Sequence, residues 1–110
     1  MSDETVETVE TDVDPFAALL AAVKTYLQIT WTDEETDARL TELINAGKAY
    51  LDLLFYDSPG EYDSPGVERT LLFEYVRYAR DGATDVFENN YRAMILAAQH
   101  ERMVTAYVDT

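Results

Sequence analysis

Apolar residues recur at three- and four-residue spacing along four segments of the chain, a period that predicts α-helices. The predicted helices span about residues 15 to 28, 33 to 55, 65 to 80 and 85 to 105. No segment alternates apolar and polar residues for long enough to predict a strand. With 110 residues, the chain has room for one domain with one modest core. The sequence therefore predicts a small all-α protein, a four-helix bundle.

Residues that favour helix ends lie at the expected boundaries. The predicted N-terminal caps are Asp14 before Pro15, Thr32 with Glu35 as a capping box, and Ser64 before Pro65. Gly82 follows the third helix and suits the left-handed residue that closes a helix. These signals divide the helical region into the same four segments.

Charge is the second strong feature of the chain. It has 22 acidic and 8 basic residues, a formal net charge of −14. A module that binds DNA or RNA by itself normally has the opposite sign, because neutralised phosphates supply much of its affinity. Residues 1 to 14 hold six acidic residues and no basic one, in a low-complexity pattern. We expect a flexible acidic arm over 1–13, a helical domain over 14–104 and a short tail over 105–110.

Signals for catalysis, cofactors or metals are weak. The chain has no cysteine, which excludes disulfides and thiolate metal sites. His100 is the only histidine, and no second ligand or nucleophile lies near it in the sequence, so we interpret it as an ordinary surface or interface residue. The acidic run "TDEETD" fits a helix N-terminus better than a calcium loop. We therefore expect neither an enzyme nor a cofactor. Without a signal peptide or a long apolar run, we also expect a soluble protein with no membrane contact.

A duplicated turn, "YDSPGEYDSPG", occupies residues 56 to 66 between two predicted helices. Its prolines lack a backbone donor and its glycines favour turns, so it cannot be helical. We expect the loop to project from the helix pair and to contact a neighbouring subunit or a channel. The alternative is a solvent-exposed linker between the two helices that was lengthened by duplication. The candidate contact residues are Tyr56, Asp57, Pro59, Glu61, Tyr62, Asp63 and Pro65.

Aromatic residues fall into two groups. One group follows the apolar stripes and is expected to pack on the core with its hydroxyls at the rim: Tyr50, Tyr75, Tyr78 and Tyr91. The other lies at helix ends or in the duplicated turn, where a monomer would leave it wet: Tyr26, Trp31, Phe55, Tyr56 and Tyr62. Local packing and a protein interface both explain the second group, since aromatics are enriched at interfaces.

Two longer segments, "VKTYLQITWTDEETDARLTELINAGKAYL" and "LLFEYVRYARDGATDVFENNYRAMI", carry a resemblance to a known family. Over about residues 16 to 102 the chain resembles the head-tail connector, or adaptor, proteins of long-tailed double-stranded DNA phages and prophages. The resemblance implies a structural protein of the virion neck, made in the host cytoplasm. It also implies a homo-oligomeric ring, typically of twelve copies, under the portal protein. Such a ring extends the DNA channel and docks a stopper or tail-completion protein.

The acidic charge agrees with a channel role, because lysine and arginine contacts to phosphate would slow DNA that must pass without specific binding. The alternative function is a small acidic interaction module or DNA mimic, which would present carboxylates to a basic partner.

The C-terminal segment "RMVTAYVDT" loses the helical period and has a β-prone, apolar ending. In the family that the chain resembles, this segment reaches into the portal. The candidate portal-binding residues are Arg102 as the polar anchor, with Val104, Tyr107 and Val108. The alternative is the frayed end of the fourth helix.

Overall fold

The computed structural model describes residues 14–109, with side chains as far as residue 105. Within this range the chain forms four helices and no strand: α2 (Pro15–Tyr26), α3 (Glu34–Leu54), α4 (Val67–Arg80) and α5 (Thr84–Asp109). The predicted all-α class with four helices is confirmed. The predicted acidic arm, residues 1–13, lies outside the described residues. None of the described helices is long and apolar enough to cross a membrane.

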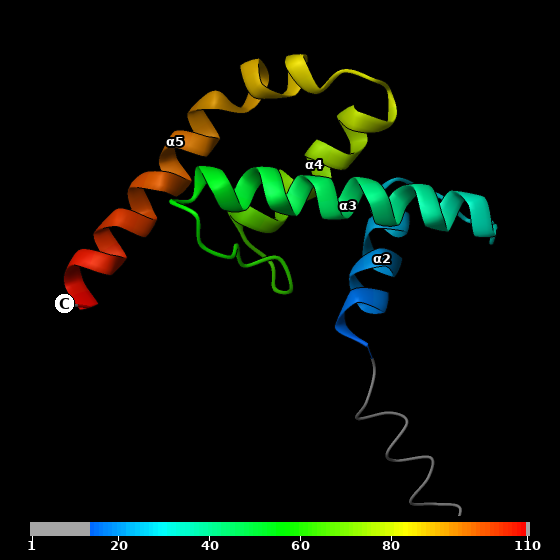
Figure 1. Cartoon of the computed structure of the whole chain (residues 1–110), viewed down its shortest axis with the longest axis horizontal. Coiled ribbons are helices and arrows are strands. Elements are labelled where there is room, and N and C mark those ends of the chain that lie inside the picture. Colours follow the sequence, from blue (N-terminus) through cyan, green and yellow to red (C-terminus); the bar gives the residue numbers. More distant parts are fainter. Residues whose placement is uncertain (1–13, 110) are drawn as a thin grey trace, which may run out of the picture.

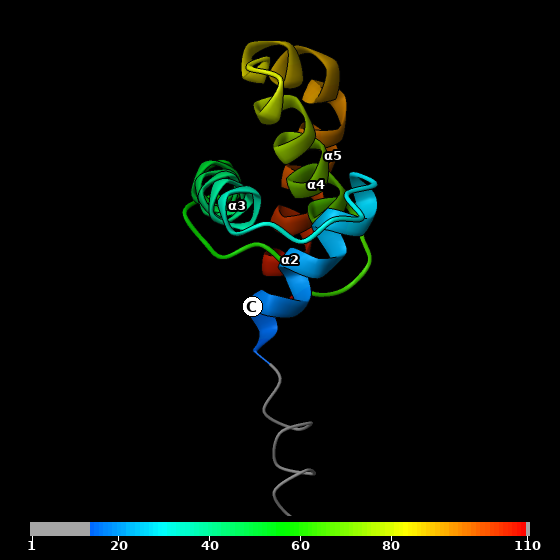
Figure 2. The same cartoon turned by 90° about the vertical axis from the view of Figure 1, so that its right-hand side faces the viewer.

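The helices pack in sequence order, each on the one before it (Figure 1). The long α3 lies across the molecule, and α2 and α4 both pack on the same side of it, where Tyr26 of α2 contacts Phe73 of α4 (Figure 2). Helix α5 returns from the tip of α4 and runs past the C-terminal end of α3. The molecule measures 50 × 40 × 19 Å, and its radius of gyration is 16.3 Å, against about 13 Å for a compact domain of this size. The described fold is therefore thin and open.

The core lies where the four helices cross. Its largest fully buried side chains are Val23, Leu40, Ile44, Leu51, Phe55, Leu71, Leu72, Val76 and Phe87. Gly47 allows α3 and α4 to approach closely, because a Cβ there would lie 2.8 Å from the side chains of both Leu72 and Tyr75. Most of the predicted helical stripes thus face inward, whereas Val67, at the start of α4, remains 42% exposed.

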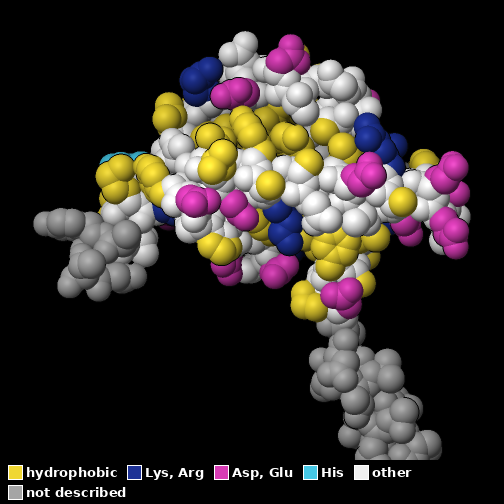
Figure 3. All heavy atoms as spheres, viewed as in Figure 1, with side chains coloured by type: hydrophobic (Ala, Val, Ile, Leu, Met, Phe, Trp, Pro, Cys, Tyr) yellow, Lys and Arg dark blue, Asp and Glu magenta, His cyan; other side chains and the backbone are white. Residues whose placement is uncertain are grey.

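An aromatic cluster fills the corner between α3, α4 and α5. The ring of Phe87 lies at its centre, 5.2 to 6.4 Å from the rings of four tyrosines. These are the tyrosines expected on the core: Tyr50, Tyr75, Tyr78 and Tyr91. All four are partly buried, which confirms the expectation. Hydrophobic side chains are visible in the hollow above α3 in Figure 3.

Helix starts agree with the sequence only in part. The Asp14 carboxylate accepts the Phe16 N–H, as predicted. The capping box at Thr32 is wrong: Asp33 is the cap, because its carboxylate accepts both the N–H and the hydroxyl of Thr36. The third helix starts later than predicted, at Val67 with Gly66 as its cap, so Ser64 and Pro65 belong to the loop.

Helix ends show one agreement and one difference. Gly82 is left-handed, with φ at 68°, as predicted. Helix α5 bends at Tyr91, where the backbone leaves helical geometry, and then continues to Asp109 where an extended tail was expected. No glycine or proline follows Gly82 to stop the helix. The Gln99 side chain also donates to the carbonyl of Leu54, a group at the end of α3 that has no partner within its own helix.

Truncation of Leu71 tests the core. Leu71 is fully buried, so Leu71→Ala should lower the free energy of unfolding by about 2–5 kcal/mol, through lost burial and the cavity that remains. Leu53→Ala is the matched control, because Leu53 is 68% exposed and its truncation should change stability by less than about 0.5 kcal/mol. Urea denaturation followed by circular dichroism measures both; equal effects would mean that the helix faces are wrongly assigned.

Candidate interaction site at the duplicated turn

The duplicated turn folds back on the domain. Tyr62, in the second copy, is only 4% exposed, and its hydroxyl donates to Asp52 Oδ1 at 2.7 Å. The Gly60 N–H donates to the same oxygen at 2.8 Å. The expectation that the loop projects is therefore wrong for Tyr62. The physical reason is that the Tyr62 ring joins the core while one carboxylate of α3 binds both its hydroxyl and the loop backbone.

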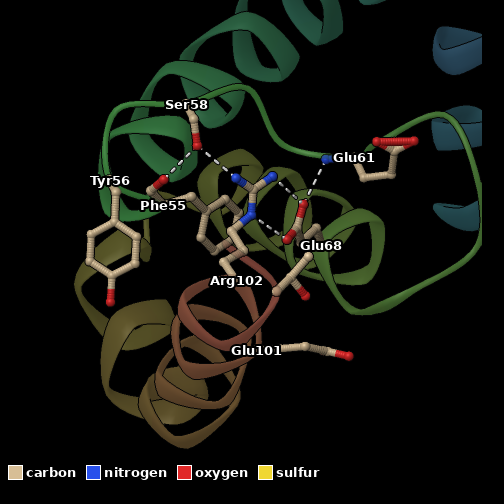
Figure 4. Close-up of a pocket in the computed structure, with 8 residues that line it drawn as sticks. Phe55, Tyr56, Ser58, Glu61, Glu68, Glu101 and Arg102 are labelled. Carbon is tan, nitrogen blue, oxygen red and sulfur yellow. Dashed lines mark hydrogen bonds and ion pairs between the residues drawn. The ribbon is translucent and has the colours of Figure 1, made fainter. Parts of the chain in front are cut away.

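Arg102 on α5 holds the loop from the other side (Figure 4). Its guanidinium forms a bidentate pair with Glu68 of α4, at 2.7 and 3.0 Å. It also donates to Ser58 Oγ at 2.6 Å and to the Pro59 carbonyl at 2.7 Å. The same group lies over the ring of Phe55, 4.8 Å from its centroid. We call these contacts the Arg102 clamp; it joins α4, α5 and the first copy of the turn.

The first copy begins with a strained conformation. Tyr56 and Asp57 both have positive φ, 63° and 58°, which costs about 1–2 kcal/mol per residue outside glycine. The Ser58 N–H donates to the Asp52 carbonyl and the Ser58 hydroxyl to the Phe55 carbonyl. These two bonds, together with the clamp, hold this turn in place.

Electrostatics keep the clamp charged. Hydrogen bonds from Arg102 lower the pKa of Glu68 below its ordinary value and outweigh the opposing effect of burial. The same hydrogen bonds raise the pKa of Arg102. Burial, followed by the bond to Asp52, raises the pKa of Tyr62 well above its ordinary value. At neutral pH, Glu68 and Arg102 are therefore ions, and Tyr62 is a neutral donor.

An open cavity of about 670 Å³ lies beside the clamp. Its lining residues are Phe55, Tyr56, Ser58, Glu61, Glu68, Glu101, Arg102 and Thr105. Tyr56 is 55% exposed at its edge, and Glu61 and Glu101 are exposed carboxylates. Because Arg102 neutralises Glu68, the remaining character of the cavity is aromatic and anionic. This chemistry suits a cationic side chain of another protein.

Of the loop residues predicted as contacts, all except Tyr62 are exposed: Tyr56, Asp57, Pro59, Glu61, Asp63 and Pro65. Their role at a subunit contact or channel stays a prediction. Phe55 was also expected to be wet, but it is fully buried under Arg102. The side chains of Tyr26, Trp31 and Tyr56 are exposed in the single chain, as the sequence predicted for a monomer.

The C-terminal candidates have a different outcome. Arg102 uses its donors within the chain, and its role as the anchor of a portal contact stays a prediction. Val104 is 45% exposed and stays a candidate. The side chains of Tyr107 and Val108 lie outside the described residues. His100 is exposed on α5, and in the described part of the chain no group of residues could hold a metal ion.

Sequence reasoning missed the partners of the loop. Phe55 follows Leu51 by four residues. Extending the apolar stripe of the second predicted helix by one turn would therefore have predicted that Phe55 is buried. Asp52 and Glu68 carry no such signal, because they are two of many carboxylates in an acidic chain. The pairing of Glu68 with Arg102 spans 34 residues and depends on how α5 turns back.

A second polar cluster joins α2, α4 and α5. Glu74 is 5% exposed and accepts hydrogen bonds from the hydroxyls of Tyr26 and Tyr91 and from Arg77. Burial opposes its charge, but these bonds outweigh burial and lower the pKa of Glu74. Burial and the bond to Glu74 raise the pKa of Tyr26 to about 12. The carboxylate is fully paired, so we assign this cluster to fold stability.

The chain matches no protein-family model, no curated protein and no solved structure. The assignment of function therefore depends on the chain's own residues and geometry.

The two copies of the turn allow a matched test. Tyr62→Phe removes the hydroxyl that donates to Asp52, and we expect a loss of about 1–2 kcal/mol in the free energy of unfolding. Tyr56→Phe makes the same change in the first copy, where the ring is half exposed, and should leave stability unchanged. Chemical denaturation compares the variants; equal stability of the two would contradict the burial of Tyr62.

Acid should weaken the clamp. The folded pKa of Glu68 lies below its ordinary value of 4.5, so its contribution is present above about pH 4.5 and is lost as the pH falls through the folded pKa. Glu68→Gln should therefore cost roughly 1–2 kcal/mol at pH 7, and the difference from wild type should shrink at lower pH. Urea unfolding between pH 7 and pH 3 measures this difference; a constant gap would exclude the charged pair as its cause.

Proposed function

We propose that the protein is a structural component of a phage or prophage neck, a connector whose copies assemble in a ring on the portal protein. One observation carries the proposal: a thin, open subunit leaves large hydrophobic side chains exposed at helix ends and along α5. These are Tyr26, Trp31, Leu53, Tyr56, Val67, Val86, Leu96, Met103 and Val104. An assembly would cover part of this surface, since aromatic residues and methionine are enriched at protein interfaces.

Three further features support this function over a catalytic one. The described polar clusters are closed networks: Glu74 is satisfied by three partners, and Arg102 is bound to the loop and Glu68. The resemblance of residues 16 to 102 to connector proteins points in the same direction. A net charge of −14 suits a channel wall past which DNA slides, because few cations are available to bind phosphate.

The proposed portal contact is the end of α5 and the residues that follow it. The clamp at Arg102 fixes the root of this segment on the domain. Beyond it, Val104 is exposed, and the sequence continues with the apolar Tyr107 and Val108. An apolar helical segment can bind in a groove of a partner protein. The fixed root then holds the rest of the domain in place on the portal.

Truncation after Thr105 tests this contact while leaving the clamp intact. The full chain should remain bound to purified portal rings encoded by the same genome, as seen by co-sedimentation and electron microscopy. The truncated chain should keep the far-ultraviolet circular dichroism of the described helices but no longer sediment with the rings. Equal retention of both chains would exclude the end of α5 as the attachment point. Failure of the full chain to bind would contradict the connector function itself.

A further inference from the structure

From Ala93 onward, beyond Arg92 and the bend at Tyr91, helix α5 presents an outer face without charge. Ala93, Leu96, His100 and Met103 follow one another at spacings of three, four and three residues, and all four are exposed. Leu96 is 57% and Met103 55% exposed. We call these four residues the outer seam. The spacing is that of a helix seam that pairs with another helix.

The domain does not use this face itself. Ile95, Ala98 and Arg102 lie on the inner side of α5, where the first two are buried and the third forms the clamp. On a helical wheel of 100° per residue, the outer seam lies nearly opposite them. The imidazole, cyan in Figure 3, lies beside hydrophobic side chains over the C-terminal half of α5.

The outer seam lacks charge in a chain that is otherwise strongly acidic. Between residues 93 and 104 the only charged residues are Glu101 and Arg102, and neither belongs to the seam. The flanking Ala97 and Val104 are apolar and exposed. A basic partner would find no carboxylate here to pair with. A face of the same neutral character, such as the seam itself, is the complementary surface.

We propose that the outer seam binds the outer seam of a second copy of this chain, with the two helices antiparallel. A two-fold axis midway between Leu96 and Met103, beside His100, places Leu96 of each chain against Met103 of the other. Such a contact is isologous and closes at two copies. Copies in a ring all point the same way, so this pairing joins free chains and not ring neighbours, and it is independent of the proposed portal contact.

Charge favours the antiparallel arrangement. The helices α2, α3 and α4 lie on one side of the C-terminal half of α5 (Figure 1). Parallel helices would bring these two acidic bodies together at the same end of the seam, whereas antiparallel helices place them at opposite ends. Because each chain carries a charge of −14, the larger separation lowers the repulsion, and salt lowers it further.

The size of the seam sets the expected strength. Residues 93 to 104 span about 18 Å of helix, which buries less than the roughly 800 Å² per partner of a standard interface. A polar side chain at the centre of a seam also lowers stability in favour of a defined register. We therefore expect a reversible dimer that forms at high concentration.

Sedimentation of the full chain tests the pairing, over about 10 to 500 μM and in roughly 0.15 M salt to screen repulsion. We expect a monomer–dimer equilibrium. The double variant Leu96→Asp, Met103→Asp should stay monomeric throughout. The matched control Val86→Asp, at another exposed valine of α5 that precedes the bend, should dimerise like wild type. His100→Leu should tighten the dimer by about tenfold or more, because it replaces the polar centre with an apolar side chain.

Orientation has its own test, because the chain has no cysteine. A mixture of Leu96→Cys and Met103→Cys chains should form a disulfide between the two variants, and each variant alone should form little. Disulfides within each separate variant, and not in the mixture, would indicate parallel helices and overturn the proposal. A monomeric wild-type chain at every concentration, or a His100→Leu dimer no tighter than wild type, would also overturn it.

Discussion

The ion pair between Arg102 and Glu68 joins two helices and a loop across 34 residues of the sequence. It joins the start of α4 to the C-terminal third of α5, and through Ser58 and Pro59 it fixes the loop that lies between α3 and α4. The guanidinium also covers Phe55, so one side chain closes the core and binds the loop at once. Breaking a pair of this kind costs more than its net contribution, because the remaining ion is left without a partner. Without it, the duplicated turn would be held to α3 through Asp52, by the bonds from Ser58, Gly60 and Tyr62, together with the weaker Asp57 N–H bond to Leu53.

Helix identity could be predicted because it depends on local periodicity. Leu71, Leu72 and Val76 show the α4 stripe directly, and Asp14 before Pro15 marks the start of α2. The cap at Asp33 and the start at Val67 were missed by one or two residues, since several neighbouring residues can cap a helix equally well. The path of the loop could not be predicted, because it depends on contacts between residues far apart in the sequence.

The candidate site could likewise be predicted only in part. The sequence indicated that the duplicated turn is not helical and that its tyrosines matter. It did not show that Tyr56 and Tyr62, identical in local sequence, have opposite exposures, 55% and 4%. That difference depends on Asp52, which lies on α3 within reach of only the second tyrosine. The end of α5 was likewise expected to leave the helix, whereas its backbone stays helical to Asp109.

The two copies of "YDSPG" have different structural roles in the folded chain. This difference affects which mutations each copy can accept over evolutionary time. The second copy supplies a core residue, so a mutation of Tyr62 alters the whole domain. In the first copy, the clamp binds a serine hydroxyl and a backbone carbonyl, while the side chains of Tyr56 and Asp57 face outward. A duplication of this kind preserves the original structural role in one copy. It leaves the other free to acquire new partners without loss of the fold.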